Sequence, residues 1–217
     1  MSSAEAVIRE AWHHIAGREH ELIIEDVLAR YREPHRRYHT AVHVMWVLRH
    51  VDDLLEASPQ AAHTGVDAAA IRVAAMFHDV IYDAKSAANE VNSAALAHRA
   101  MQTVGWSMAR CDHVADMIQD TATHVAHSAD SAVLLDADLA VLAADRAGYQ
   151  AYVDGVRAEY SHVAEPAWRH GRAAVLRGFL QRSALFATAT GRQCFESRAR
   201  TNIAAELAAL QKAGDIG

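Results

Sequence analysis

The stretch DAAAIRVAAMFHDVIYD, residues 67–83, carries the strongest signals for both the fold and the chemistry of this chain. Its apolar residues recur near helical period, which predicts a helix from about Asp67 to about Tyr82. Near the end of this helix, His78 is followed directly by Asp79. Neighbouring helix positions differ by about 100°, so at a helix end both side chains can reach one cation. Alone, the pair is equally well explained as a helix-capping aspartate beside an unrelated histidine.

The composition of the whole chain favours helices. Hydrophobic residues make up 52% of the 217 positions, and only three prolines and ten glycines interrupt them. Alanine, leucine, glutamate and arginine are strong helix formers and dominate the sequence. Alternating β-branched and aromatic runs, which are typical of strands, are absent. The length suits one sizeable core. We therefore expect a single all-α domain over residues 1–217.

Helical periodicity and stop signals divide this domain into nine expected helices. Gly105 is a plausible helix stop, and Pro166 suits the first turn of a helix. A metal-site core is expected over about 36–145 and a C-terminal helical extension over about 146–217. The expected helices cover residues 3–31, 40–57, 67–82, 87–104, 107–123, 130–144, 145–163, 165–182 and 196–212.

The net charge and the lack of targeting signals limit the classes of partner and the cellular location that we expect. The formal net charge of −6 argues against the broad basic face that duplex nucleic acid binding needs. Cys111 and Cys194 match no metal or redox spacing, so we expect buried thiols and a reducing compartment. The N-terminal MSSAEAVIRE has no apolar signal region, and no stretch approaches the roughly 18 apolar residues of a membrane span. We expect a cytoplasmic protein, and the sequence does not indicate its oligomeric state.

Histidine is unusually frequent, at 15 of 217 residues. Since histidine is the commonest metal ligand, this excess prompts a search for a metal site. His39 and His43 lie four residues apart and share a helical face. Asp136 and Asp138 lie in the apolar segment LLDADL, although carboxylates are rarely buried unless paired or bound to metal. Because they are two residues apart, we expect only one to face a site and the other to be solvated.

The order of a histidine, a His-Asp pair and a later aspartate in helical sequence resembles the HD-domain superfamily of metal-dependent phosphohydrolases. More narrowly, the chain is similar to a small bacterial branch of predicted HD phosphohydrolases, and the similarity extends over nearly its whole length. The resemblance implies an HD-domain helical bundle with additional C-terminal helices. The segments that carry it are RYHTAVH (37–43), FHDVIYD (77–83), NEVNSA (89–94), LLDADLAVL (134–142), RAEY (157–160) and residues 196–207.

The resemblance also implies a set of metal ligands. Carried over residue by residue, the ligands are His43, His78, Asp79 and Asp138, with His39 as the rival to His43. A mixed nitrogen and oxygen set suits manganese, iron, cobalt, nickel or zinc, and magnesium less well. One or two ions are expected. His39 is otherwise assigned to orienting a ligand or touching the substrate.

The resemblance also implies roles for four further residues. Asp83, one helical turn after Asp79, is expected to position or deprotonate the attacking water, with a turn-forming aspartate as the alternative. His124 is a candidate for lining the site or holding a second metal ion. Arg37 is a candidate for binding substrate phosphate, whereas the neighbouring Arg36 is expected to be a solvated charge. Glu90 is expected beside the ligands rather than in the reaction.

These assignments lead to one expected function and two alternatives. The resemblance implies hydrolysis of a small phosphorylated substrate, such as a nucleotide, by metal-activated water. The residues themselves indicate only the activated water, and the resemblance supplies the phosphate. One alternative is an HD-type di-iron oxygenase, which His124 would support. The other alternative is a regulatory binding module in which the metal is structural.

Overall fold

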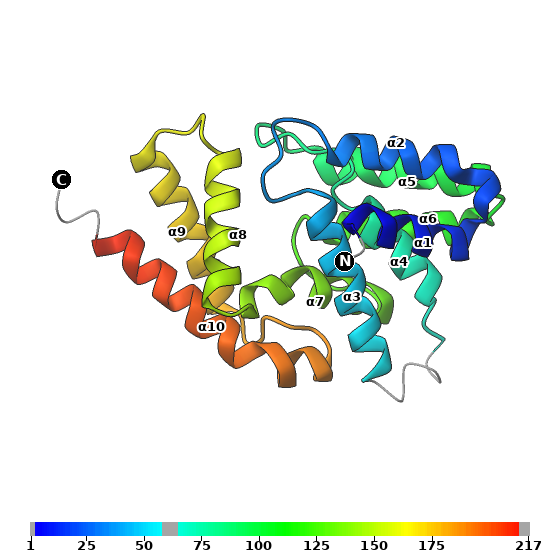
Figure 1. Ribbon diagram of the computed structural model, residues 1–217. Helices are drawn as coiled ribbons and strands as arrows, with labels where there is room; N and C mark the ends of the chain where they lie inside the picture. Colours follow the sequence, from blue (N-terminus) through cyan, green and yellow to red (C-terminus); the bar gives the residue numbers. More distant parts are fainter. Residues whose placement is uncertain (1–2, 58–64, 213–217) are drawn as a thin grey trace. The chain divides into compact units, whose positions relative to one another are not determined.

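The computed structural model describes residues 3–57 and 65–212 and is all-helical in these two ranges (Figure 1), which confirms the predicted fold class. The chain divides into two compact units, Met1–Asp138 and Leu139–Gly217. The single domain expected from the sequence stays a prediction. Among the described residues, no helix combines the length and the apolar character needed to cross a membrane.

The first unit contains all the residues expected to bind metal. Its last helix, α7, runs one residue into the second unit. The elements are α1 (Ala4–Ala16), η1 (Arg18–His20), α2 (Glu21–Tyr31), α3 (Ala41–Glu56), α4 (Ala68–Phe77), α5 (Asn89–Val104), α6 (Met108–Asp120) and α7 (Ala129–Leu139).

Helix α4 forms the buried centre of this unit. It contacts α1, α3, α5 and α6 (Figure 1). Every residue from Val73 to Phe77 is fully buried. Burial of a side chain as large as Ile71, Met76 or Phe77 contributes about 1.5–3 kcal/mol. The C-terminal end of α4 is therefore held firmly, and His78 and Asp79 follow directly from it.

The first expected helix, over residues 3–31, is wrong as a continuous element. Gly17 interrupts it with a φ of 84°, and the chain passes through η1 before α2 begins. A Cβ at this position would lie 2.3–2.5 Å from the carboxylate atoms of Glu19. The Glu19 carboxylate is the end of an exposed, flexible side chain and can move away, so it is the positive φ of the break that favours glycine.

Several other boundaries also differ from the expectation. Helix α4 ends at Phe77 rather than near Tyr82, so His78 is its C-cap. The helix expected over 130–144 becomes α7 followed by the 3-10 turn η3 (Ala140–Ala143), and the last helix begins earlier, at Ala189. Gly105 adopts the predicted left-handed cap with a φ of 90°, and Pro166 lies in the predicted first turn.

The second unit has its own core. Besides η3 it contains α8 (Arg146–Glu159), α9 (Glu165–Gln181) and α10 (Ala189–Lys212). Leu176, Phe186 and Ile203 are buried at the centre of its hydrophobic cluster. Cys194 on α10 is exposed, which corrects the expectation that both cysteines are buried; Cys111 is buried as expected.

Candidate metal centre

Three elements of the first unit bring a histidine–carboxylate cluster together. His43 lies on α3, His78 caps α4, and Asp138 lies near the end of α7. One ligand atom from each of these residues lies within 4.8 Å of the other two, so the cluster could hold a metal ion. Asp79 is not part of this group of three, but its Oδ2 atom lies 2.9 Å from Nε2 of His78 and 3.5 Å from Nε2 of His43.

The spacing of these atoms fits ligands around one ion. Nε2 of His43 lies 3.2 Å from Nε2 of His78 and 3.2 Å from Oδ1 of Asp138. Nε2 of His78 lies 3.6 Å from the same Asp138 oxygen. Two ligands bonded at about 2.1 Å to one ion, at right angles, are about 3.0 Å apart. The observed separations are close to this edge length, so the donor set fits a divalent cation.

A hydrogen bond of His78 fixes the tautomer in which its neutral ring can bind a metal ion. Its Nδ1 atom lies 2.9 Å from the carbonyl oxygen of Ala75, one turn earlier in α4. A carbonyl can only accept, so Nδ1 carries the hydrogen and the neutral ring directs the Nε2 lone pair at the cluster. Nδ1 of His43 is buried and has no hydrogen-bond partner among the described residues. The Nε2 atoms of both rings are thus the donors that the site presents.

Burial differs between the histidines and the carboxylates. The side chains of His43 and His78 are each 2% exposed, whereas those of Asp79 and Asp138 are 17% and 14% exposed. The carboxylates are therefore the part of the cluster that is more open to solvent.

Opposite charges inside the cluster outweigh the cost of burial. Burial raises the pKa of the Asp79 carboxyl, but the adjacent His78 and His39 hold it well below its usual range. Burial lowers the pKa of His78, but Asp79 and Asp138 raise it well above its usual range. Without a cation, the imidazoles therefore hold protons that a metal ion would have to displace.

The structure separates His43 from its rival His39. His43 lies within the cluster, whereas Nε2 of His39 lies 4.0 Å from Oδ2 of Asp79. The His39 ring packs on Tyr82, with the ring centroids 4.2 Å apart. His39 is thus placed at the edge of the cluster, where the sequence analysis put it as the alternative to a ligand.

His124 lies beside the cluster, next to Asp138. Its Nε2 atom is 3.1 Å from Oδ2 of Asp138, the carboxylate oxygen that does not face His43. Its φ of 51° is the only positive value among the described residues other than glycine.

Asp136, two residues before Asp138, is buried at 1% exposure, so the expectation that one of the two aspartates is solvated is wrong.

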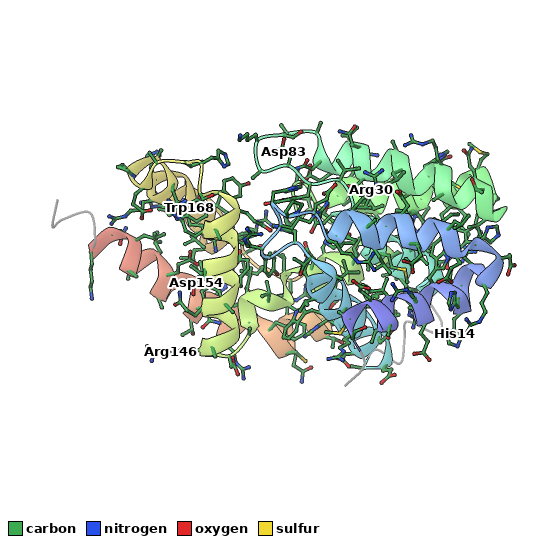
Figure 2. All side chains as sticks on the ribbon, turned by 45° about the horizontal axis from the view of Figure 1, so that its top comes forward. His14, Arg30, Asp83, Arg146, Asp154 and Trp168 are labelled. Carbon is green, nitrogen blue, oxygen red and sulfur yellow. The ribbon has the colours of Figure 1, made fainter. Side chains whose placement is uncertain are left out.

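Asp83, Glu90 and Arg37 lie outside the cluster. Asp83 is exposed in the loop between α4 and α5 (Figure 2), and its Oδ1 accepts a hydrogen bond of 2.9 Å from the backbone N–H of Lys85. Glu90 is half-buried in the first turn of α5. Among the described residues, neither acid has a hydrogen bond or ion pair with the four predicted ligands. Arg37 is exposed and donates to the carbonyl oxygens of Pro34 and Arg36.

Arg36 is another residue for which the expectation is wrong. It was expected to be a solvated charge, but its side chain is 0% exposed. Its guanidinium donates to the carbonyl oxygens of His39, Asp79 and Val80. An arginine in a short polar segment carries no local signal of burial, because its partners at 79 and 80 are more than forty residues away.

Comparison with protein-family models, with curated proteins and with solved structures found no match for this chain. The fold and the cluster by themselves define a helical protein with a histidine–carboxylate site that could hold a metal ion.

Proposed function

We propose that this protein is a metal-dependent hydrolase of a small phosphate ester, of the HD type. The observation that carries the proposal is the meeting of His43, His78 and Asp138 at distances that suit the ligands of one divalent ion, with Asp79 next to the two histidines. These are the four positions that the resemblance to HD phosphohydrolases assigns as ligands. The phosphate in this proposal comes from that resemblance, because the residues alone favour only activation of a water.

Residues of this chain supply the ligand atoms and the negative charge for a bound cation. His43 and His78 offer Nε2 atoms, and Asp79 and Asp138 offer two negative charges toward a cation of manganese, iron, cobalt, nickel or zinc. When bound, such an ion supplies an acidified water and polarises a phosphoryl oxygen. The two imidazoles close the buried side, so the partly exposed carboxylates flank the side on which a substrate approaches.

A screen of metals and phosphate esters tests the proposal. The protein is stripped with a chelator, reloaded with manganese, cobalt or zinc, and assayed for phosphate release from nucleotides and simple phosphoesters. Turnover is expected with at least one metal and absent from an Asp138→Asn variant prepared in parallel. Metal-loaded protein that releases no phosphate from any of these esters would contradict the hydrolase proposal.

A second candidate, an HD-type di-iron oxygenase, is favoured by one observation. The two carboxylate oxygens of Asp138 lie near different imidazoles, Oδ1 near His43 and Oδ2 near His124. A carboxylate in this position can serve two ions at once. Elemental analysis of protein purified without added metal separates the candidates: two irons per chain with oxygen consumption favour the oxygenase, and a single redox-inert ion favours the hydrolase.

A further inference from the structure

Arg36 joins two segments that carry the candidate metal ligands. Its Nη1 atom donates to the carbonyl oxygen of His39 at 3.1 Å and to that of Asp79 at 2.7 Å. Its Nη2 atom donates to the carbonyl oxygen of Val80 at 3.0 Å. His39 immediately precedes the N-cap of α3, the helix that carries His43. One side chain thus connects the approach to α3 with the turn that follows α4.

The carbonyl groups that Arg36 binds have no partner within a helix. Helix α4 ends at Phe77, so the next carbonyl groups lack the amides of a further helical turn. A buried carbonyl without a partner costs about 1–3 kcal/mol, and a cation at the C-terminal end of a helix is favourable. Tyr31 reinforces this end, because its hydroxyl donates to the carbonyl oxygen of Met76 at 3.0 Å.

The guanidinium of Arg36 is itself held in place. Its Nε atom donates to the carboxylate of Glu33 at 3.2 Å. The centre of the guanidinium lies 5.0 Å from the ring centroid of Tyr31 and 5.6 Å from that of Tyr82. These contacts and its complete burial leave the side chain little freedom to take another position.

We propose that Arg36 is a positioning residue for the candidate metal centre. By bonding the carbonyl groups of His39, Asp79 and Val80 together, it keeps the start of α3 and the His78–Asp79 turn at the separation at which their ligand atoms meet. The inference rests on the proposed metal binding, and it assigns a function to a residue that touches neither metal nor substrate.

Lysine cannot replace arginine in this role. A guanidinium presents five N–H donors in a planar fork, whereas an ammonium is a compact point charge with three donors on a flexible stem. Lysine at position 36 would keep the positive charge but could not hold three carbonyl groups of two segments at fixed separation. Loss of a group that orients metal ligands typically weakens metal affinity about 10–100-fold.

The test compares Arg36→Lys with a matched variant in the second unit, Arg200→Lys. Arg200 also binds two backbone carbonyl groups, those of Leu180 and Arg182, and one glutamate, Glu196. Both variants and the wild type are titrated with Mn²⁺ by calorimetry, at a temperature at which circular dichroism shows them folded. The visible absorption of added Co²⁺ reports the ligand geometry separately from stability.

We expect Arg36→Lys to bind Mn²⁺ about 10–100-fold more weakly and to change the Co²⁺ spectrum. Arg200→Lys should keep the wild-type affinity within twofold and the wild-type spectrum. A folded Arg36→Lys protein with wild-type affinity and spectrum would overturn the inference while leaving the metal centre intact. Wild-type protein that binds no Mn²⁺ would overturn the metal centre and the inference together.

If Arg36→Lys does not fold, a measurement on the wild type replaces it. Coupling between two sites is reciprocal, so a metal that depends on Arg36 must in turn stabilise the bonds of Arg36. Hydrogen exchange of the Arg36 Nε–H, followed by NMR, should slow at least about tenfold on addition of Zn²⁺, in line with the expected change in affinity. An unchanged exchange rate in Zn²⁺-loaded protein would refute the positioning role.

Discussion

The Nε2 atoms of His43 and His78 face each other at 3.2 Å although the two residues lie on different helices. Since Nδ1 of His78 donates to the carbonyl oxygen of Ala75, the neutral His78 ring has a lone pair at Nε2. Two imidazole nitrogens this close need a proton or a cation between them. The nearby Asp79 and Asp138 oxygens favour the positive charge, so this point is where a metal ion would contribute most stability.

Removal of one ligand charge should abolish tight metal binding. Asp138→Asn keeps the volume of the side chain but removes the charge that faces His43 and His78. We expect Mn²⁺ affinity to fall by at least about 100-fold, beyond the range found for groups that only orient ligands. Saturating Mn²⁺ should raise the melting temperature of the wild type but not of the variant.

The matched control for this experiment is Asp116→Asn, which removes a carboxylate from the exposed face of α6. It should bind Mn²⁺ like the wild type in the same calorimetric titration. Asp138→Asn protein with wild-type affinity would show that Asp138 is not a ligand.

His124 offers a substitution that separates stability from function. Its left-handed φ of 51° costs a side chain about 1 kcal/mol, which glycine avoids. His124→Gly should therefore keep or slightly raise the melting temperature of the metal-free protein. Without the imidazole near Oδ2 of Asp138, we expect metal affinity to fall about tenfold.

His127→Ala serves as the control for His124→Gly, because His127 is exposed and its ring contacts Asp120 rather than the cluster. It should leave metal affinity unchanged. A His124→Gly protein that loses melting temperature but keeps its metal affinity would mean that the histidine is structural.

Metal binding should release protons, and more of them at lower pH. Although burial lowers the pKa of His43 and His78, Asp138 and Asp79 raise both above the ordinary value of about 6.5. The metal-free site therefore holds protons to a higher pH than free imidazoles would, and a metal ion must displace those protons. Apparent affinity should rise as pH increases through the raised values. Calorimetry at pH 6.5 and pH 9, in buffers of different ionisation enthalpy, counts the protons.

The same shifts give the metal-free protein a pH-dependent stability. A raised histidine pKa contributes stability that is complete below the unfolded value and is lost as pH rises through the folded value. In the presence of a chelator, the melting temperature should therefore fall as pH increases above about 6.5. A melting temperature that rises over this range would contradict the charged pairing of these rings with Asp79 and Asp138.

Asp83 can be tested directly as the predicted general base. Because its Oδ1 accepts the Lys85 amide hydrogen and its side chain is exposed, we expect it to form the turn rather than to activate water. Asp83→Asn preserves this acceptor and should change kcat less than about threefold. A loss of about 100-fold or more, the size of a general-base contribution, would restore the catalytic role.

Periodicity and composition were enough to predict the helical fold, because helix formation depends on residues three and four positions apart. The break at Gly17 escaped prediction, since glycine inside a helical pattern is tolerated elsewhere and only its φ of 84° distinguishes it. The resemblance to HD phosphohydrolases pointed to His43, His78 and Asp138, which meet in the cluster, but it also included Asp79 and left His39 as the rival to His43.

The sequence by itself therefore determined that the chain is helical and which side chains could serve as metal ligands. Tertiary structure decided the rest: that His43 rather than His39 enters the cluster, that Asp136 is buried while Asp138 is only partly exposed, and that Arg36 is enclosed. The physical reason is the separation along the chain between the residues that determine each property. Helical pattern is read from neighbours within one turn, whereas burial and convergence depend on how α3, α4 and α7 pack, and those contacts join residues up to 95 positions apart.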